Sequence, residues 1–286
     1  MELLHQIDLT DLLRRALAED LGQGDITTAA TVNSGQRGRA KITVKEPRMI
    51  LCGGPILEQV FRLAGAVPNL TFLAPESVEL KAGDRIAQID GTLAGMLIGE
   101  RVALNFVQLL SGIATLTRKY VDAVAGTRAK IIDTRKTHPG LRALEKYAVR
   151  AGGGFNHRFG LDSGILIKDN HIAAAGSIQG AIERTRRLAP HALRVEIECE
   201  TLAQVAEALA ARADAILLDN MALADLRRAR EMAREAGHND LLLEASGGVT
   251  LETVRAIAET GVDVISIGAL THSAPAVDIS MRVEAV

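Results

Sequence analysis

The residues from Leu193 to Asn220 read LRVEIECETLAQVAEALAARADAILLDN, and their pattern decides the fold. A strand-like run, Leu193–Glu198, precedes an amphipathic stretch, Thr201–Arg212, and the run Asp214–Asp219 follows with four consecutive apolar residues. Continuously apolar runs of this length are typical of parallel strands that are buried on both faces. Thr201 stands where a side-chain oxygen can cap the free N–H groups of a helix. The segment therefore predicts a strand–helix–strand unit.

The same alternation continues through the C-terminal half of the chain. Further strands are predicted at Ala129–Asp133, Gly164–Lys168, Asp240–Ala245 and Val262–Ile267, and further helices at Leu223–Ala236 and Thr250–Thr260. Repeated units of this kind imply right-handed crossovers and a parallel sheet, either a barrel or a doubly wound sheet. The region spans about 160 residues, which is short beside the roughly 250 of a complete eight-unit barrel. This length favours an incomplete barrel of six or seven strands.

The first part of the chain has a different pattern. Half-exposed strands are predicted at Arg39–Glu46 and Arg85–Ile89, where polar and apolar residues alternate, and helices at Ile56–Leu63 and Leu93–Leu110. We expect Gly112 to end the last of these helices and to separate it from another that reaches about Val124. A domain boundary is therefore expected near Gly112.

Composition limits the class of protein. The chain has 286 residues, of which 48% are hydrophobic, enough for a sizeable core. A net charge of −2 and an aromatic content of 2% argue against a nucleic-acid surface, and two cysteines are too few for a disulfide framework. The longest charge-free apolar stretch, Val102–Thr117, is too short to span a bilayer, and the N-terminal residues show no basic signal region. We expect a cytoplasmic protein with no nucleic-acid or membrane partner.

Charged residues or glycines follow the carboxyl end of every predicted strand. They are Thr134, Arg135 and Lys136; Lys168; Glu198; Asp219 and Asn220; Ser246, Gly247 and Gly248; and Gly268 with His272. In a parallel barrel these strand ends open on one face, and that face carries the active site. The segment from Thr134 to His171 also has a local net charge of +4 within the nearly neutral chain. We interpret the pattern as a site for a small anion.

Two of these segments have alternative interpretations. The amides of Ser246–Thr250 could hold a phosphate at a helix N-terminus, or the glycines could serve an ordinary tight turn. Gly268 favours phosphate, because the last two loops of a barrel often form such a site. Glu198 and Asp219 could share a divalent cation, or they could cap local N–H groups or pair with arginine. We assign Glu198 to the barrel mouth and Glu196 to the opposite face of its strand.

Lys168 could be either an anion ligand or a Schiff-base lysine of the aldolase kind. The neighbouring cations Arg135, Lys136, His157 and Arg158 favour the anion ligand, because a Schiff-base site does not need so many positive charges. His157 and Arg158 alone could also belong to a solvated loop. The histidines and cysteines have no spacing typical of a zinc site.

Several motifs resemble the quinolinate phosphoribosyltransferase family. The most specific are DTRKTHPGLR at Asp133–Arg142, GGGFNHR at Gly152–Arg158 and LIKDNH at Leu166–His171. Further matching motifs lie at Glu19–Thr27, Glu100–Arg101, Leu104–Phe106, Leu110–Thr115, Glu145–Val149 and Glu244–Gly248. The matches follow the order of the family over nearly the whole chain, from about Leu17 to Arg282.

The resemblance implies a fold and an assembly. The expected fold is an N-terminal α/β sandwich domain over residues 1–112, an open α/β barrel of six to seven strands over residues 113–274, and a final segment, residues 275–286, that returns to the first domain. A seventh strand is expected between Gly152 and Leu161. The family forms homodimers, or hexamers built as trimers of dimers, in which the partner closes each barrel mouth. Arg101 would then act in the neighbouring subunit's site.

The resemblance also implies a reaction, in which quinolinate and phosphoribosyl pyrophosphate give nicotinate mononucleotide, pyrophosphate and CO2 in NAD biosynthesis. Arg101, Thr134, Arg135, His157, Arg158 and Lys168 would bind quinolinate. Lys136, Asn220, Ser246, Gly247, Gly248, Gly268 and His272 would bind phosphoribosyl pyrophosphate. Glu198 and Asp219 would bind Mg²⁺ and the ribose hydroxyls, and Lys136, Glu198 and Asp219 are the expected catalytic residues.

Two other functions stay open. A related group linked to molybdenum transport shares the arginine–lysine–threonine stretch and a His-Arg pair, but it tends to lack the Leu166–His171 run. A barrel that only binds a phosphorylated ligand is a second alternative. Such a protein would gain nothing from the carboxylates of Glu198 and Asp219 at its mouth.

Overall fold

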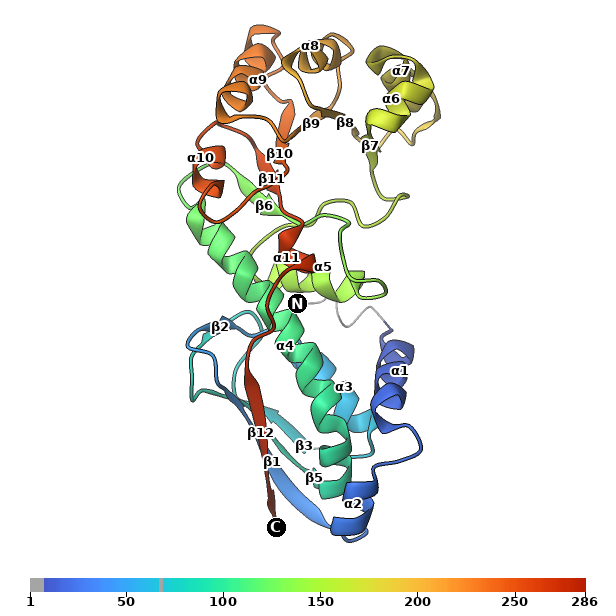
Figure 1. The fold of residues 1–286 in the computed structure, drawn as a ribbon, viewed down its shortest axis with the longest axis vertical. Helices are drawn as coiled ribbons and strands as arrows, with labels where there is room; N and C mark the ends of the chain where they lie inside the picture. The colour runs from blue at the N-terminus through green and yellow to red at the C-terminus, as the bar shows by residue number, and fades with distance from the viewer. Residues whose placement is uncertain (1–7, 67–68) are drawn as a thin grey trace. The chain divides into compact units, whose positions relative to one another are not determined.

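The computed structural model describes residues 8–66 and 69–286, which form two compact units (Figure 1). The first unit contains the described residues up to Arg118, together with Ala143–Gly153 and Ser273–Val286. The second contains Lys119–Arg142 and Gly154–His272. Each unit has its own sheet, and the predicted class of an α/β protein with an N-terminal sheet domain and a parallel barrel is confirmed.

The first unit is built on an antiparallel sheet with the strand order β12-β1-β5-β3. These strands are β1 (Arg37–Val44), β3 (Asn69–Phe72), β5 (Arg85–Thr92) and β12 (Ile279–Ala285), and β2 (Met49–Ile50) pairs separately with β4 (Glu79–Leu80). The apolar residues of β1 are buried and alternate with more exposed ones, as the sequence pattern predicts. The last strand pairs with the first from Gly38↔Ala285 to Val44↔Ile279, so the two ends of the chain complete one sheet.

The first unit also contains helices (Figure 1). They are α1 (Thr10–Leu21), α2 (Ile26–Thr31), α3 (Gly54–Leu63), the first part of α4 (Leu93–Ala123) and most of α5 (Arg142–Ala151). By length and composition alone α4 could cross a membrane, but 56% of its most apolar window is buried inside the protein. Core packing accounts for this hydropathy, because a helix that is apolar on most sides is also typical of a protein interior.

The prediction that Gly112 ends a helix is wrong. Helix α4 continues through Gly112 to Ala123 without interruption. A Cβ atom at this position would lie 2.1 Å from the carbonyl oxygen of Pro275. The glycine therefore allows the returning C-terminal segment to approach the helix backbone, and the single glycine costs the helix only about 1 kcal/mol.

The second unit contains a six-stranded parallel sheet with the order β6-β11-β10-β9-β8-β7. Its strands are β6 (Lys130–Ile132), β7 (Ile165–Ile167), β8 (Val195–Cys199), β9 (Ala215–Asp219), β10 (Leu242–Ser246) and β11 (Val264–Ser266). The helices between them are α6 (Asp169–Ala175), α7 (Ile178–Leu188), α8 (Leu202–Ala210), α9 (Leu223–Glu235), α10 (Val254–Ala258) and α11 (Ala269–His272). All six predicted strands are confirmed, with ends that differ by one or two residues.

The expected seventh strand is present only as a bridge. Phe155 pairs in parallel with Ile132, its N–H donates to the Ile131 carbonyl at 2.9 Å, and its own carbonyl accepts the Asp133 N–H at 3.1 Å. This contact extends the sheet beyond β6 by a single residue. The barrel is therefore open between β6 and β7.

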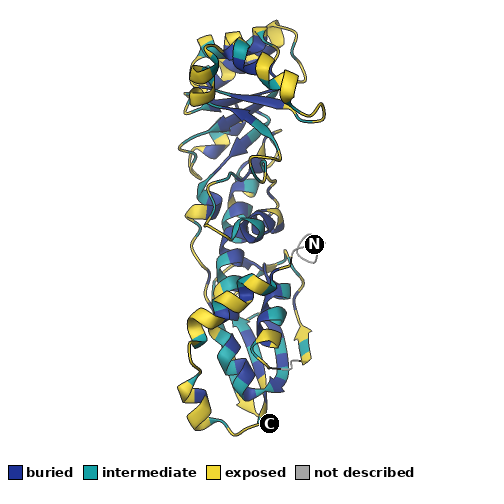
Figure 2. Ribbon diagram, turned by 90° about the vertical axis from the view of Figure 1, so that its right-hand side faces the viewer, coloured by how far each residue is buried: buried dark blue, intermediate teal, exposed yellow. Residues whose placement is uncertain are grey.

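Local sequence predicts the start of one helix correctly and the start of another wrongly. Thr201 accepts the Gln204 N–H and caps α8, as predicted. The predicted helix start at Thr250 is wrong, because Thr253 Oγ1 accepts the Thr250 N–H at 2.9 Å and holds residues 250–253 in a turn. Helix α10 begins only at Val254. Figure 2 shows that the strands of this unit are mostly buried, whereas its helices expose their outer faces.

Candidate active site

The carboxyl ends of β9 and β10 bring four predicted residues together. Asp219 and Ser246 are register partners, and the Asn220 N–H donates to the Ser246 carbonyl at 2.9 Å. Asn220 has a φ of 53°, and its Nδ2 donates to Asp219 Oδ2 at 2.7 Å. A Cβ atom on Gly247 would lie 2.1 Å from Asn220 Oδ1, so only glycine leaves room for this side chain. The next residue, Gly248, also has a positive φ, of 59°.

A second group of predicted residues meets after β11. A Cβ atom on Gly268 would lie 3.0 Å from His272 Nε2 and 3.1 Å from Lys136 Cδ. Thr271 Oγ1 donates to the Lys136 carbonyl at 2.8 Å, which fixes the loop after β6 against α11. The basic side chains of Lys136 and His272 therefore lie over a glycine. This arrangement suits an anion.

Asp133 connects two parts of the cationic segment Thr134–His171. This buried carboxylate at the end of β6 accepts the Asn156 Nδ2 hydrogen at 2.5 Å and the His157 main-chain N–H at 2.9 Å. Thr134 follows directly, and its Oγ1 accepts the Lys136 N–H at 3.0 Å. Asp133 therefore holds the segment that contains His157 beside the segment that contains Arg135.

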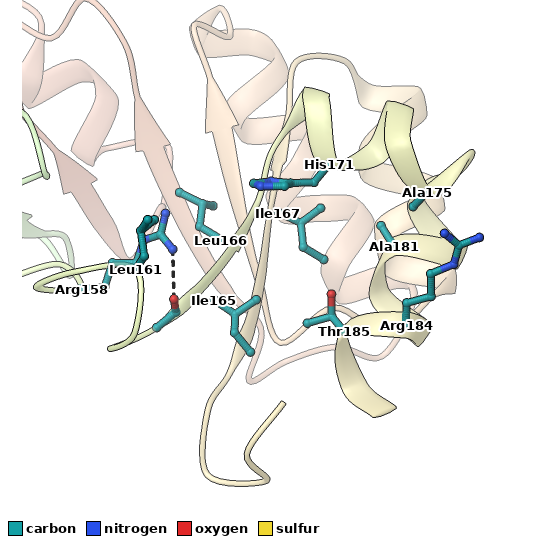
Figure 3. A pocket seen from close by; sticks show the side chains of 11 residues that line it. Arg158, Leu161, Ile165, Leu166, Ile167, His171, Ala175, Ala181, Arg184 and Thr185 are labelled. Atoms are coloured by element: carbon teal, nitrogen blue, oxygen red, sulfur yellow. Dashed lines mark hydrogen bonds between the residues drawn. The ribbon is translucent and has the colours of Figure 1, made fainter. Parts of the chain in front are cut away.

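The guanidinium groups of Arg135 and Arg158 are close enough to affect each other. Burial lowers the pKa of Arg158, the charge of Arg135 lowers it further, and the charge of Glu196 opposes both effects. Arg158 Nη1 also donates to the Gly164 carbonyl at 3.0 Å (Figure 3). Arg135 Nε is buried and has no hydrogen-bond partner among the residues that the structure describes. A buried donor without an acceptor is costly, so this position is suited to an anionic ligand.

His157 is held through both ring nitrogens. Its Nδ1 accepts the Arg158 N–H at 2.7 Å, and its Nε2 lies 3.4 Å from Glu196 Oε2 and 3.6 Å from Glu244 Oε2. Burial opposes protonation of the ring, but the hydrogen bond to Glu196 and the charge of Glu244 outweigh it, so the pKa of His157 is raised. The solvated loop considered for His157 does not fit this environment.

The assignment of Glu196 and Glu198 to opposite faces is wrong. Residues two apart in a strand share a face, because side chains alternate with a period of two. Glu198, Leu217 and Glu244 are register neighbours across β8, β9 and β10, so these acidic groups line the same side of the sheet. Burial, followed by the charge of Glu196, raises the pKa of Glu244 to about 8.

Lys168 forms an ion pair with Glu198. The ion-pair partner of Glu198 is therefore a lysine from the adjacent strand end, a partner that none of the alternatives for Glu198 named. An ion-paired ammonium is not a nucleophile, so the arrangement favours Lys168 as an anion ligand over a Schiff-base lysine.

Glu198 and Asp219 offer the donor set that Mg²⁺ prefers. Both are carboxylates at the carboxyl ends of adjacent strands, and Mg²⁺ is usually bound by one or two carboxylates together with substrate phosphates. A different group, His157 with Glu196 and Glu244, has ligand atoms within 4.8 Å of one another. It does not suit a metal, because a ring that accepts an N–H at Nδ1 carries its own hydrogen on Nε2.

Arg101 belongs to the first unit. It is an exposed residue of α4 in the first unit, whereas the other predicted site residues belong to the second unit. Sequence reasoning missed Asp133, Asn156, Glu196 and Glu244 as members of the site. A signal existed for Glu244, which is a single acidic residue inside the apolar strand LLLEAS.

Two cavities border the cationic segment. One of about 420 Å³ lies toward the amino ends of the barrel strands, where Lys130, Ala215 and Leu242 line it, and His157, Arg158, Glu196 and Glu244 also border it. The other, of about 360 Å³, lies beside β7, where Arg158, Leu161 and His171 face it with residues of α6 and α7 (Figure 3). Arg158 is common to both cavities.

The fold and this site define an open α/β barrel protein with a cationic, phosphate-suited mouth. The model of the quinolinate phosphoribosyl transferase N-terminal domain matches residues 25–111, and that of the C-terminal domain matches residues 113–282. The chain belongs to the quinolinate phosphoribosyltransferase family.

Three proteins are similar to this chain over nearly their whole length. A probable nicotinate-nucleotide pyrophosphorylase (carboxylating) of Bacillus subtilis is 45% identical over 98% of this chain and 95% of its own. The nicotinate-nucleotide pyrophosphorylase (carboxylating) of Mycobacterium leprae is 44% identical over 95% of each. The crystal structure of NadC from Streptococcus pyogenes is 40% identical, with a TM-score of 0.91 over 97% of this chain and 98% of that one.

Proposed function

We propose that the protein transfers the phosphoribosyl group of phosphoribosyl pyrophosphate to quinolinate and releases pyrophosphate and CO2, which forms nicotinate mononucleotide for NAD biosynthesis. The family and the names of its relatives support this reaction. In the structure, the observation that carries it is the buried Nε of Arg135, which lies close to Arg158 and has no hydrogen-bond partner within residues 8–66 and 69–286. Two clustered guanidiniums with an unfilled donor are what a small dianion requires.

Quinolinate would be held through its two carboxylates. Arg135 and Arg158 would take them in bidentate contacts, with Lys168, His157 and Thr134 beside them. Lys168 would exchange its ion pair with Glu198 for the substrate. Carboxylate contacts of this kind fix the pyridine ring without aromatic stacking, which suits a chain with 2% aromatic residues.

Phosphoribosyl pyrophosphate would lie across the ends of β9, β10 and β11. Gly248 has open space in which a phosphate oxygen could approach the backbone, Gly247 leaves room for the Asn220 side chain, and Ser246 and Asn220 would supply polar contacts. Lys136 and His272, which meet over Gly268, would neutralise phosphate charge. Glu198 and Asp219 would bind the ribose hydroxyls and Mg²⁺, which when bound would offset the charge of the departing pyrophosphate.

The chemistry needs positioning and charge more than a general base. The pyridine nitrogen forms a bond to the anomeric carbon while the bond from that carbon to the pyrophosphate oxygen breaks. The carboxylates of Glu198 and Asp219 would stabilise the positive charge that develops on the ribose. The pyridinium ring then accepts the electron pair of the bond to the adjacent carboxylate as CO2 leaves, and the ring carbon takes up a proton. Arg135 and Arg158 hold the ring in place during both steps.

The assembly and the location belong to the same proposal. Arg101 is exposed on α4 and would complete the quinolinate site of a neighbouring subunit in a homodimer or in a hexamer of three dimers. The cytoplasm would supply both substrates.

The decisive experiment measures product formation. The purified protein is incubated with quinolinate and phosphoribosyl pyrophosphate, with and without Mg²⁺, and nicotinate mononucleotide, pyrophosphate and CO2 are quantified. We expect equal amounts of the three products, and product formation that depends on Mg²⁺. Absence of nicotinate mononucleotide under all conditions would contradict the proposal. Binding of phosphoribosyl pyrophosphate without turnover would instead support a binding barrel, and turnover of neither substrate the molybdenum-linked alternative.

A further inference from the structure

His157 and Arg158 are supported from inside the barrel by two acidic residues that the proposed reaction does not use. Glu196 in β8 and Glu244 in β10 are both buried, and their Oε2 atoms lie 3.4 and 3.6 Å from His157 Nε2. A buried carboxylate costs free energy in the folded protein, because its charged form loses hydration, unless it is paired or hydrogen-bonded.

The ring of His157 connects these acids to the main chain of the cationic segment. Its Nδ1 accepts the N–H of Arg158 at 2.7 Å, so its hydrogen lies on Nε2 and is directed at Glu196 and Glu244. The tautomer with its hydrogen on Nδ1 would place an N–H against the Arg158 N–H, and a reversed ring would place a C–H there. The acids therefore select one tautomer and one orientation, and that orientation fixes the amide of Arg158.

The charge of Glu196 also acts on Arg158. Burial and then the charge of Arg135 lower the pKa of Arg158, and the charge of Glu196 opposes both effects. The two arginines must stay close before a dianion arrives to neutralise them.

We propose that Glu196 and Glu244 are positioning residues for the quinolinate site, which hold the His157 ring and through it Arg158 in the arrangement that binds the substrate. The inference rests on the proposed function, because it concerns the same site. It assigns no contact between these acids and the substrate.

The first test measures the KM for each substrate, to distinguish a positioning role of Glu196 from an effect of its charge alone. In Glu196→Ala we expect the KM for quinolinate to rise at least tenfold, while the KM for phosphoribosyl pyrophosphate stays within twofold. Glu196→Gln keeps an acceptor for Nε2–H and should recover to within threefold of the wild-type value. Glu207→Ala, at an exposed glutamate of α8, is the matched control and should change neither constant.

Two outcomes of this test would overturn the inference. An unchanged KM for quinolinate in folded Glu196→Ala would show that Glu196 does not position the site. A lower KM would show that Glu196 only repels the dianion. In both cases the wild-type protein still forms product, so the proposed function is judged separately.

The second test uses the wild-type protein and does not depend on the folding of a variant. Two-bond ¹H–¹⁵N correlation spectra of histidine-labelled protein at pH 8 report the tautomer of each ring, and His157→Gln identifies the signal of His157. We expect the hydrogen on Nε2. A hydrogen on Nδ1 would remove the proposed connection to Arg158 and overturn the inference.

Discussion

Arg135 and Glu244 differ from ordinary surface charges because each has a buried polar atom. Arg135 Nε is a buried donor without an acceptor, and Glu244 Oε1 is a buried oxygen without a hydrogen-bond partner, each among the described residues. Such groups cost free energy in the folded protein unless a ligand or a change of protonation compensates them. Each therefore leads to a measurable prediction.

Replacement of Arg135 should weaken quinolinate binding selectively. We expect Arg135→Ala to lose roughly 2–5 kcal/mol of binding free energy, the usual cost of truncating one partner of a desolvated charge contact. Arg135→Lys should recover only part of it, because an ammonium lacks the planar fork of the guanidinium. Isothermal titration calorimetry with quinolinate measures both values.

The controls for Arg135 are a second ligand and a second arginine. Binding of phosphoribosyl pyrophosphate should change by no more than a fewfold in Arg135→Ala. Arg227→Ala, at an exposed arginine of α9, should bind quinolinate like the wild type. Equal losses for both ligands would contradict the assignment of Arg135.

Glu244 should make stability depend on pH. Its pKa is raised from 4.5 to about 8, mainly by burial, so between these values the folded protein holds a proton that the unfolded chain has lost. The free energy of unfolding therefore falls as the pH rises, by up to about 1.4 kcal/mol per pH unit from this group. Glu244→Gln replaces the protonated acid with a neutral group of the same shape and removes the effect.

Urea unfolding at several pH values tests this. The free energy of unfolding of Glu244→Gln minus that of the wild type should increase from pH 5 to pH 8 and level off above it. A difference that does not vary with pH would mean that Glu244 is ionised throughout.

At the scale of elements, helix α4 depends on Gly112. The missing side chain leaves room for the Pro275 carbonyl, which a Cβ atom would approach to 2.1 Å. Gly112→Ala should therefore destabilise the protein by about 1–3 kcal/mol, the usual cost of overpacking, although alanine favours a helix. Urea unfolding measures this change, and Lys119→Ala, at an exposed position of α4, should have little effect. A more stable Gly112→Ala protein would mean that the segment at Pro275 can move away freely.

The elements were predictable where local sequence decides them. The apolar run of β9 and the Thr201 cap of α8 depend on residues that are neighbours in the chain, and both are confirmed. The sequence pattern wrongly predicts a helix end at Gly112 and a helix start at Thr250. For Gly112 the deciding contact is with Pro275, which is distant in sequence. For Thr250 it is the hydrogen bond that its N–H donates to the Thr253 side chain, which competes with the helix.

At the scale of the whole molecule, the site was predictable as a set of strand ends but not as a network. The parallel topology alone places Arg135, Lys168 and Asp219 at one end of the barrel. The supporting acids Glu196 and Glu244 were missed, because a pattern of charges along the chain does not reveal which buried groups hold one another. Because Glu196 was assigned to the face opposite to Glu198, it was also left out of the predicted site.

The proposed exchange of Arg101 between subunits can be tested by complementation. Arg101→Ala and Arg158→Ala proteins should each be inactive with quinolinate, because each would lack one part of every site. Mixed subunits would contain one intact site in a hybrid dimer, so subunit exchange should restore activity to at most about half of the wild-type value per hybrid dimer. Native mass spectrometry shows whether hybrids form. Inactive hybrids would mean that Arg101 does not act across an interface.

The pairing of β12 with β1 sets an order on biosynthesis. A ribosome delivers β1 early, but the strand that hydrogen-bonds to its free edge consists of residues 279–285. Until those residues emerge, the nascent chain presents an unpaired edge of β1, which is a template for association with other chains. The barrel strands are all synthesised within this interval. Vectorial folding should therefore complete the second unit before the first, and a truncation that removes residues 279–285 should cause aggregation even though these residues lie outside the barrel.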